Sequence, residues 1–232
     1  MTLEVKDLCA GYQTPVVRNV SFEIKEGQLA AILGPNGAGK STLLNAMAGG
    51  VRKTSGQVLV KGQDCLPLAA KQRARRLALV RQQIPLLPGV RVAEALEMGR
   101  YAWGGPLRAD PGAKAAVAEA ARAFGLEELL NADCAALSQG QRQLVHLARA
   151  MVQSAPVLLL DEPGSALDFS NTHRLFRLLG EQLARGGRWA FSTPVSGSKR
   201  TRRRGICSAQ LNKREIFAAR SRKMWFFCER AV

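Results

Sequence analysis

The chain has 232 residues, of which 47% are hydrophobic, and this suffices for one sizeable core or for a core with a smaller lobe. Its formal net charge of +16 favours an anionic partner, but the excess is concentrated in the tail. Residues 195–232 contain 11 of the 34 Lys and Arg residues and only 2 of the 18 Asp and Glu residues. A nucleic-acid partner is therefore not expected for the bulk of the chain.

The composition also argues against several other classes of protein. The first residues carry acids and no apolar block, so no signal peptide is predicted. No apolar run approaches the roughly 18 residues of a membrane span. The five cysteines lack C-x-x-C spacing, which favours free thiols in a reducing compartment. His146 and His173 are too few for a His-based metal site, and both fall in helical patterns where we expect exposed or capping roles.

In the first half of the chain, short strands alternate with helices. Strands are predicted at residues 3–8, 20–24, 29–33, 57–62 and 77–80. Helices are predicted at residues 41–49, where glycines close the helix, and at the basic stretch 67–76. An irregular loop rich in proline follows the strand at 77–80.

The second half begins with an alanine-rich helical region from Val92 to about Leu130, interrupted by Gly and Pro. This pattern predicts an inserted helical lobe. Ser138 is expected to cap a further helix that runs to Val152. A buried strand at 157–160, a helix after Ser170 and a last strand at 189–191 follow. Strands that alternate with helices predict a largely parallel α/β sheet.

The most informative stretch reads G-x-x-x-x-G-K-S between a predicted buried strand and a predicted helix, which is the setting of a phosphate-binding loop. Its residues are Gly34, Pro35, Asn36, Gly37, Ala38, Gly39, Lys40, Ser41 and Thr42. The glycines let backbone N–H groups turn toward phosphate oxygens, and the helix N-terminus adds positive potential. Lys40 can reach the β- and γ-phosphates, and the Ser41 hydroxyl is placed to ligate Mg²⁺.

A pair of carboxylates ends the buried strand at 157–160. Asp161 suits a Mg²⁺-directed side chain, and Glu162 can take a proton from water. Alone, this pair is as consistent with an acidic turn at a strand end. Together with the phosphate loop it indicates a nucleotide hydrolase.

Four further pieces occur in order: Gln82, LSQGQ at 137–141, LLLDEP at 158–163 and SALD at 165–168. With the phosphate loop, this order resembles the ATPase subunit of ATP-binding cassette (ABC) transporters over residues 3–193. The resemblance implies an α/β fold: a RecA-like P-loop NTPase core with a mostly parallel sheet, an N-terminal antiparallel β region and an inserted α-helical subdomain at about 84–140. The ATPase domain would span residues 1–194.

The resemblance also implies roles for individual residues toward ATP and Mg²⁺. Tyr12 would stack on adenine, although a packed turn tyrosine is the alternative. Lys40 and the backbone of 37–42 would bind phosphates. Ser41, Asp161 and Gln82 would surround Mg²⁺, with Gln83 as an alternative to Gln82. The catalytic residues would be Glu162, the general base, with Gln82 and Lys40.

The implied site is shared between two copies of the chain. Ser138 and Gly140, with Gln141 of the same motif, would contact the γ-phosphate bound to a second subunit, and Asp168 would couple the two sites. The implied partners are a second ATPase subunit, integral membrane permease subunits and, indirectly, a substrate-binding protein. The protein would be peripheral, at the cytoplasmic face of the inner or plasma membrane.

The chain departs from the family at Pro194, where the family has a histidine that contacts the γ-phosphate and orients the attacking water. Hydrolysis is therefore expected to be severely weakened. After Val195 neither a strand nor a regulatory helix is predicted, and residues 195–232 form a basic tail that is not expected to be an independent domain. An altered reading frame or a degenerate C-terminus explains this tail better than an arm for nucleic acid or anionic membrane does.

The cargo is only weakly encoded, because an ATPase subunit contacts its permease and not the cargo. Residues 97–101 and 167–171 are similar to importers of iron–siderophore, haem, cobalamin or molybdate, and we rank iron chelates first. Two other classes are considered: a soluble ABC ATPase of nucleic-acid metabolism and a nucleotide-binding module without hydrolysis. The first usually has two cassettes or a long coiled-coil insertion, and the sequence has neither.

Overall fold

The computed structural model describes residues 2–81, 88–104, 110–163, 188–194 and 225–230, together with single positions between 167 and 181. Near the N-terminus four strands form an antiparallel sheet in the order β2-β1-β4-β5. Its strands are β1 (Thr2–Gly11), β2 (Pro15–Lys25), β4 (Lys53–Val60) and β5 (Gln63–Asp64). The expected antiparallel β region is confirmed.

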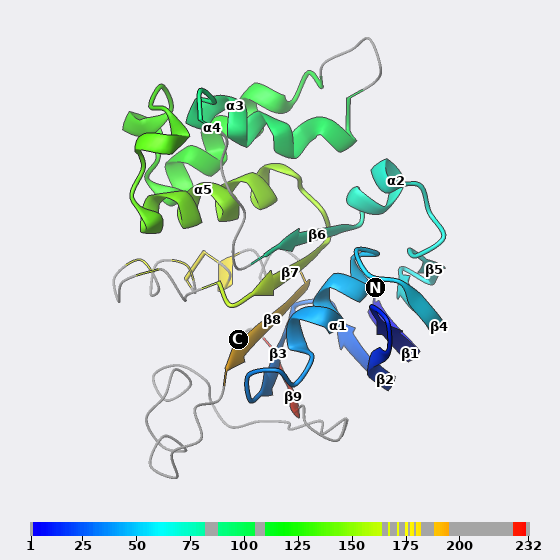
Figure 1. Cartoon of the computed structure of the whole chain (residues 1–232). Helices are drawn as coiled ribbons and strands as arrows, with labels where there is room; N and C mark the ends of the chain where they lie inside the picture. Colours follow the sequence, from blue (N-terminus) through cyan, green and yellow to red (C-terminus); the bar gives the residue numbers. More distant parts are fainter. Residues whose placement is uncertain are drawn as a thin grey trace.

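A second sheet of five strands lies at the centre of the molecule, in the order β6-β7-β8-β3-β9 (Figure 1). Its strands are β3 (Gln28–Gly34), β6 (Leu77–Val80), β7 (Val157–Asp161), β8 (Arg188–Pro194) and β9 (Trp225–Arg230). The first four are mutually parallel, as the alternation of strands and helices predicts. All their carboxyl ends therefore meet at one edge, where the phosphate loop follows β3.

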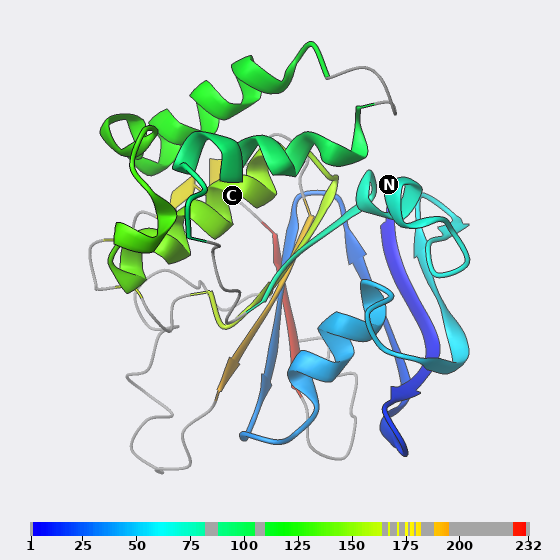
Figure 2. The ribbon, with the colours of Figure 1, turned by 45° about the horizontal axis from the view of Figure 1, so that its top comes forward.

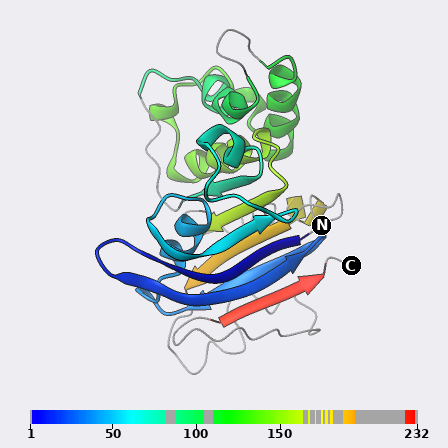
Figure 3. The ribbon, with the colours of Figure 1, turned by 90° about the vertical axis from the view of Figure 1, so that its right-hand side faces the viewer.

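Strand β9 corrects the expectation that no strand follows Val195. It pairs antiparallel with β3, with Ala31 opposite Phe227, and lies at an outer edge of the sheet (Figure 3). Its sequence, WFFCER, contains the aromatic residues that strands favour, but it shows no clear alternation of polar and apolar residues. The partner of such a short segment is decided by the open edge of β3, which is remote in the sequence.

The helices form two groups. Helix α1 (Lys40–Met47) follows the phosphate loop, and the short α2 (Ala70–Ala74) precedes β6, so the helix expected at 67–76 is shorter than predicted. The helical lobe contains α3 (Val92–Glu97), η1 (Met98–Ala102), α4 (Ala113–Phe124), η2 (Glu127–Leu129), η3 (Cys134–Ala136) and α5 (Gln139–Val152). Figure 1 shows α3, α4 and α5 packed together at one end of the molecule.

Strand β7 is buried along its whole length, and its side chains alternate between two hydrophobic cores. Val157 and Leu159 join the core that contains α1 and the antiparallel sheet, while Leu158 and Leu160 join the core of the helical lobe. Helix α1 and the lobe therefore cover opposite faces of the central sheet, as Figure 2 also shows.

Helix α5 contributes much of the lobe core, and this corrects one expectation. His146 lies inside α5 and is only 4% exposed, so it is neither exposed nor a cap. The helical pattern was predicted, but the side of the helix that carries His146 is covered by strands and helices distant in sequence. His173 lies outside the described residues.

Where η1 meets α5 there is no room for a side chain on Gly99. A Cβ atom at Gly99 would lie 2.5 Å from the main-chain oxygen of Arg149 and 3.2 Å from the amide nitrogen of Gln153. We therefore expect Gly99→Ala to lower the free energy of unfolding by about 1–3 kcal/mol, because backbone must move. Gly180→Ala is the control: nothing lies within 4 Å of its Cβ position, and stability should stay equal or rise by up to about 1 kcal/mol. Urea denaturation measures both, and equal effects would contradict the close approach.

Candidate functional site

The phosphate loop has the conformation its glycines predict. Gly37 and Gly39 have φ angles of 75° and 95°, in the left-handed region that glycine adopts at little cost. The Gly39 conformation ends the loop and starts α1, which has no side-chain cap and no acidic residue in its first turn. Among the described residues, none accepts a hydrogen bond from the backbone N–H groups of residues 39–42. These groups form a cradle that fits phosphate oxygens.

Lys40 places a positive charge inside this loop. Its side chain is 5% exposed, and Nζ donates hydrogen bonds to the main-chain oxygens of Gly34 (2.9 Å) and Pro35 (3.0 Å). Within the described part of the chain, no carboxylate lies within 4 Å of this ammonium. A buried cation that is held only by neutral carbonyls fits a bound anion, since burial without a counter-charge is unfavourable.

Ser41 and Asp161 are brought together from distant parts of the sequence. Ser41 Oγ donates a hydrogen bond to Asp161 Oδ1 at 3.0 Å, and the Asp161 side chain is 4% exposed. A hydroxyl and a carboxylate oxygen are hard ligands, and Mg²⁺ typically uses few such protein ligands together with phosphate and water. The pair therefore fits the predicted Mg²⁺ position. No group of three or more His, Cys, Asp or Glu suited to a metal occurs among the described residues.

Glu162 follows Asp161 in an unusual backbone conformation. Its φ angle is 49°, which a residue with a side chain adopts only at some energetic cost. The next residue, Pro163, is held by Gln143 of α5, whose Nε2 donates to the Pro163 main-chain oxygen at 3.3 Å. Gln143 is 5% exposed and was not singled out from the sequence. The available signal was a polar residue next to the apolar run of α5 that begins at Leu144.

Ser138 begins α5, as predicted, and makes a capping box with Gln141. Ser138 Oγ accepts from the Gln141 amide at 3.2 Å, and Gln141 Oε1 accepts from the Ser138 amide at 2.9 Å. Ser138 is nevertheless exposed, and Gly140 lies in the first turn of α5. Helices α5 and α1 cover opposite faces of the sheet, and among the described residues Ser138 and Lys40 make no hydrogen bond to each other.

Tyr12 lies in the turn between β1 and β2 and is 70% exposed. The start of β2 lies close to the phosphate loop, because a Cβ atom at Gly39 would be 3.1 Å from Val16 Cγ1. An exposed aromatic ring in the adjacent turn is available to stack on a base, and no packing contact in the described residues supports the alternative of a packed turn tyrosine. The role of Tyr12 toward adenine stays a prediction.

Gln82, with its alternative Gln83, and Asp168 lie outside the described residues. Pro194 ends β8, and its backbone pairs in register with Gly34, while Ser192 pairs with Asp161. Position 194 therefore lies between the phosphate loop and the end of β7, at the edge of the sheet where phosphates would bind.

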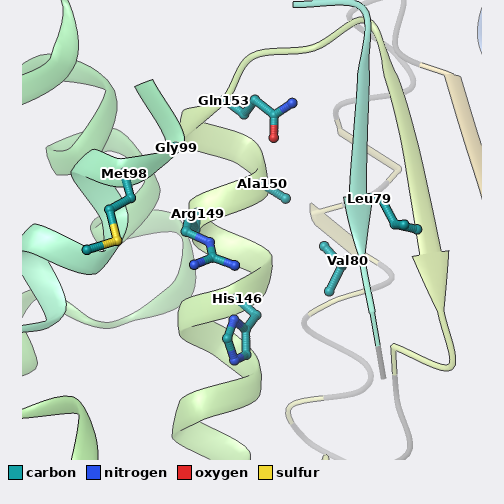
Figure 4. Close-up of a pocket in the computed structure, with 8 residues that line it drawn as sticks. All are labelled: Leu79, Val80, Met98, Gly99, His146, Arg149, Ala150 and Gln153. Carbon is teal, nitrogen blue, oxygen red and sulfur yellow. The ribbon is translucent and has the colours of Figure 1, made fainter. Parts of the chain in front are cut away.

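A pocket of about 210 Å³ lies in another part of the molecule, between α5, β6 and η1 (Figure 4). Met98, Arg149 and Gln153 are among its lining residues. Burial lowers the pKa of the Arg149 guanidinium below its usual value.

In the described range no helix is long and apolar enough to cross a membrane.

The capping role of Ser138 can be separated from a role toward phosphate. Ser138→Ala should lower the free energy of unfolding by about 1 kcal/mol, because the Gln141 amide loses its acceptor. Ser138→Asp should stay within about 0.5 kcal/mol of the original protein, because aspartate caps equally well. Urea denaturation measures both. A large loss of stability in Ser138→Asp would show that the hydroxyl itself is needed for folding.

Comparison with known proteins gives a consistent picture. The model of the family described as ABC transporter matches residues 17–165. The hemin import ATP-binding protein HmuV of Streptomyces coelicolor is 42% identical over 75% of this chain and 61% of its own length. The cobalamin import ATP-binding protein BtuD of Halobacterium salinarum is 40% identical over 77% of this chain and 45% of its own length. The chain thus spans about half to three-fifths of the length of these relatives.

Solved structures agree with the fold. An ATP-binding subunit of an ABC transporter has a TM-score of 0.74 and 29% identity, covering 84% of this chain and 80% of its own. A dimeric bacterial ABC transporter cassette has a TM-score of 0.73 and 28% identity, covering 83% and 88%. A metal-chelate type ABC transporter in an inward-facing conformation has a TM-score of 0.69 and 29% identity, covering 83% and 72%.

Proposed function

The chain belongs to the ABC transporter family, and we propose that it is the ATP-binding and ATP-hydrolysing subunit that energises an importer. The observation that carries this proposal is the arrangement at the carboxyl edge of the central sheet. There, buried Lys40, the N–H groups of residues 39–42, for which the described residues offer no acceptor, and the Ser41–Asp161 pair form one polar site. These groups suit a triphosphate with Mg²⁺, and the two relatives and three solved structures described above are consistent with it.

Each residue has a defined task in the proposed reaction. Bound ATP and Mg²⁺ supply the phosphoryl group and the charge that neutralises it. Lys40 and the loop amides hold the phosphates, and Ser41 and Asp161 fix the metal. Glu162 accepts a proton from the attacking water, and its strained backbone together with the Gln143–Pro163 hydrogen bond fixes where its side chain begins. Gln82 completes the metal and water site, and Tyr12 stacks on the base.

The active form that we propose is a homodimer. Ser138 and Gly140 lie on the opposite face of the sheet from α1, so a second copy has to supply these residues to the phosphates bound by the first. Gln141 supports Ser138 through the capping box, and Asp168 links the two sites. A cassette of similar fold is dimeric in its solved structure, which supports this arrangement.

We infer that the remaining partners are integral membrane permease subunits and, through them, a substrate-binding protein. The chain would lie at the cytoplasmic face of the membrane as a peripheral protein. Residues 97–101 and 167–171 are similar to importers of iron–siderophore, haem, cobalamin or molybdate. Together with the hemin import relative, this favours an iron chelate such as haem or a siderophore as cargo. Cobalamin or molybdate is the alternative cargo. Co-purification with membranes separates this function from that of a soluble ABC ATPase.

A second candidate function rests on Pro194. The position lies between Gly34 and the end of β7, where a histidine would face the phosphates, and proline offers neither an imidazole nor a backbone N–H. A chain with this proline would bind nucleotide but hydrolyse it slowly. In that case the chain is a nucleotide-binding remnant and does not energise transport by hydrolysis. The tail at 195–232 is consistent with such an altered C-terminus.

The shared site predicts ATP-dependent association. Glu162→Gln should bind ATP and form a stable dimer, because phosphates are held but water is not deprotonated. Lys40→Ala should remain a monomer because it loses nucleotide binding. The double variant Glu162→Gln, Ser138→Asp should still bind nucleotide as a monomer but should not dimerise. In a dimer, the new carboxylate of each copy would face the phosphates bound by the other copy. Size-exclusion chromatography with light scattering at saturating ATP measures this, and a monomeric Glu162→Gln would contradict the shared site.

The role of position 194 can be tested by restoring the imidazole. Pro194→His should raise steady-state phosphate release at least about tenfold over the original chain, since one transition-state contact of this kind is worth orders of magnitude in rate. Pro194→Ala is the control, because it restores the backbone N–H without the ring. Phosphate release is measured with and without permease. Turnover typical of a working transporter in the unmodified chain would refute the idea that Pro194 impairs it.

A further inference from the structure

Besides its apolar packing on the sheet, the helical lobe contacts the segment between α2 and β6 through a group of polar side chains around Trp103. Trp103 follows η1, and its Nε1–H donates to the main-chain oxygen of Gln153 at 2.7 Å, just beyond the end of α5. Two guanidinium groups lie over the indole ring. The Cζ atom of Arg75 is 5.5 Å from the ring centroid, and that of Arg100 is 5.1 Å away.

These contacts cross the boundary between the lobe and the α2–β6 junction. Gln153 Nε2 donates to the main-chain oxygens of Ala74 (2.6 Å) and Leu77 (3.1 Å), which end α2 and begin β6. Arg75 follows α2, and its Nε donates to the Ala102 main-chain oxygen of η1 at 2.8 Å. A side chain of the lobe therefore donates hydrogen bonds to main-chain oxygens of the junction, and a side chain of the junction donates one to a main-chain oxygen of the lobe.

Arg100 anchors the network within the lobe. Its Nη1 donates to the main-chain oxygen of Val152 (3.3 Å) and to Ser154 Oγ (3.1 Å), and its Nε is paired with Asp110. This pairing lowers the pKa of the Asp110 carboxyl below its usual range, so the pair is charged at neutral pH. Arg100 thus has a fixed position from which it can hold one face of Trp103.

We propose that Trp103 is a positioning residue for the proposed ATPase, acting through a latch made of Trp103, Gln153, Arg75 and Arg100. The latch holds the C-terminal end of α5, while Ser138 caps the other end of the same helix. At a rise of about 1.5 Å per residue, the 14 residues of α5 form a lever of about 21 Å, so a tilt of about 10° at the latch moves Ser138 by roughly 4 Å. A shift of that size exceeds hydrogen-bond tolerance.

The latch also borders the pocket between α5, β6 and η1. Gln153 lines this pocket and makes the two bonds to the junction, and Gly99, the close contact of η1 with α5, lines it too (Figure 4). Any change that separates η1 from α5 at the pocket therefore strains the latch. The inference about catalysis rests on the proposed function, whereas the existence of the latch does not.

The latch itself is tested by amide hydrogen exchange on the full chain. Trp103→Ala should speed exchange at least about tenfold in peptides covering 70–78, 98–104 and 150–157, because Arg75 loses its ring contact and the Gln153 main-chain oxygen loses its donor, which weakens the attachment of the junction to the lobe. Exchange in β1 and β2 should be unchanged, which distinguishes local release from global unfolding. Trp103→Phe keeps an aromatic ring for the guanidiniums to contact but lacks the N–H donor, so its effect should be intermediate. Met98→Ala in η1 is the control, because among the described residues the Met98 side chain makes no hydrogen bond, ion pair or ring contact across the boundary.

The consequence for the site is tested in the Glu162→Gln background. Trp103→Ala should raise the dissociation constant of the ATP-dependent dimer about tenfold and leave the affinity of the monomer for nucleotide unchanged, because the phosphate loop does not depend on the lobe. Met98→Ala should change neither value. Faster exchange without weaker dimerisation would overturn the positioning role, and unchanged exchange would overturn the latch. A Glu162→Gln chain that never dimerises would refute the proposed shared site, while the exchange experiment would still decide the latch.

Discussion

The hydrogen bond from Ser41 to Asp161 is the contact on which the site depends. It joins residues 120 positions apart, the start of α1 and the end of β7, across the carboxyl end of β8. Strand β7 is not the neighbour of β3 in the sheet, so the bond can form only when β7, β8 and β3 are assembled in parallel. The same assembly aligns Pro194 with Gly34 and Ser192 with Asp161. The chemistry of this edge is therefore a property of the whole sheet.

The alternation of side chains along β7 explains why the molecule has two hydrophobic cores, each of which supports a different part of the proposed nucleotide site. Leu159 and its neighbours pack with α1, which carries the phosphate loop, while Leu158 and Leu160 pack with the lobe, which carries Ser138. One buried strand thus connects both cores but separates the two sets of proposed nucleotide contacts. The separation gives a physical reason for a site shared by two copies, and it makes the orientation of the lobe important.

Residues 225–230 form a strand because the edge of β3 offers them a pairing partner, although their own sequence shows no clear alternation of polar and apolar residues. Strand β3 needs a partner on the side away from β8, since an open edge leaves N–H and C=O groups unpaired. Residues 225–230 supply that partner as β9. The same tail carries much of the excess positive charge and follows Pro194, the point at which the resemblance to the family ends. Family membership rests on residues 17–165 and is independent of this tail.

The sequence by itself determined the phosphate loop, the acidic pair at the end of β7, the cap at Ser138 and the alternation of strands and helices. These features depend on local spacing: glycines where φ must be positive, a hydroxyl where a helix begins, and an apolar run where a strand is buried. The sequence could not place His146, Gln143, Trp103 or β9, because their surroundings come from segments far away in the chain. Only the tertiary structure decided that Lys40 is buried without a carboxylate partner in the described residues, and that Ser138 lies across the sheet from it. Burial and the choice of partners depend on how elements pack, and a linear pattern does not record that.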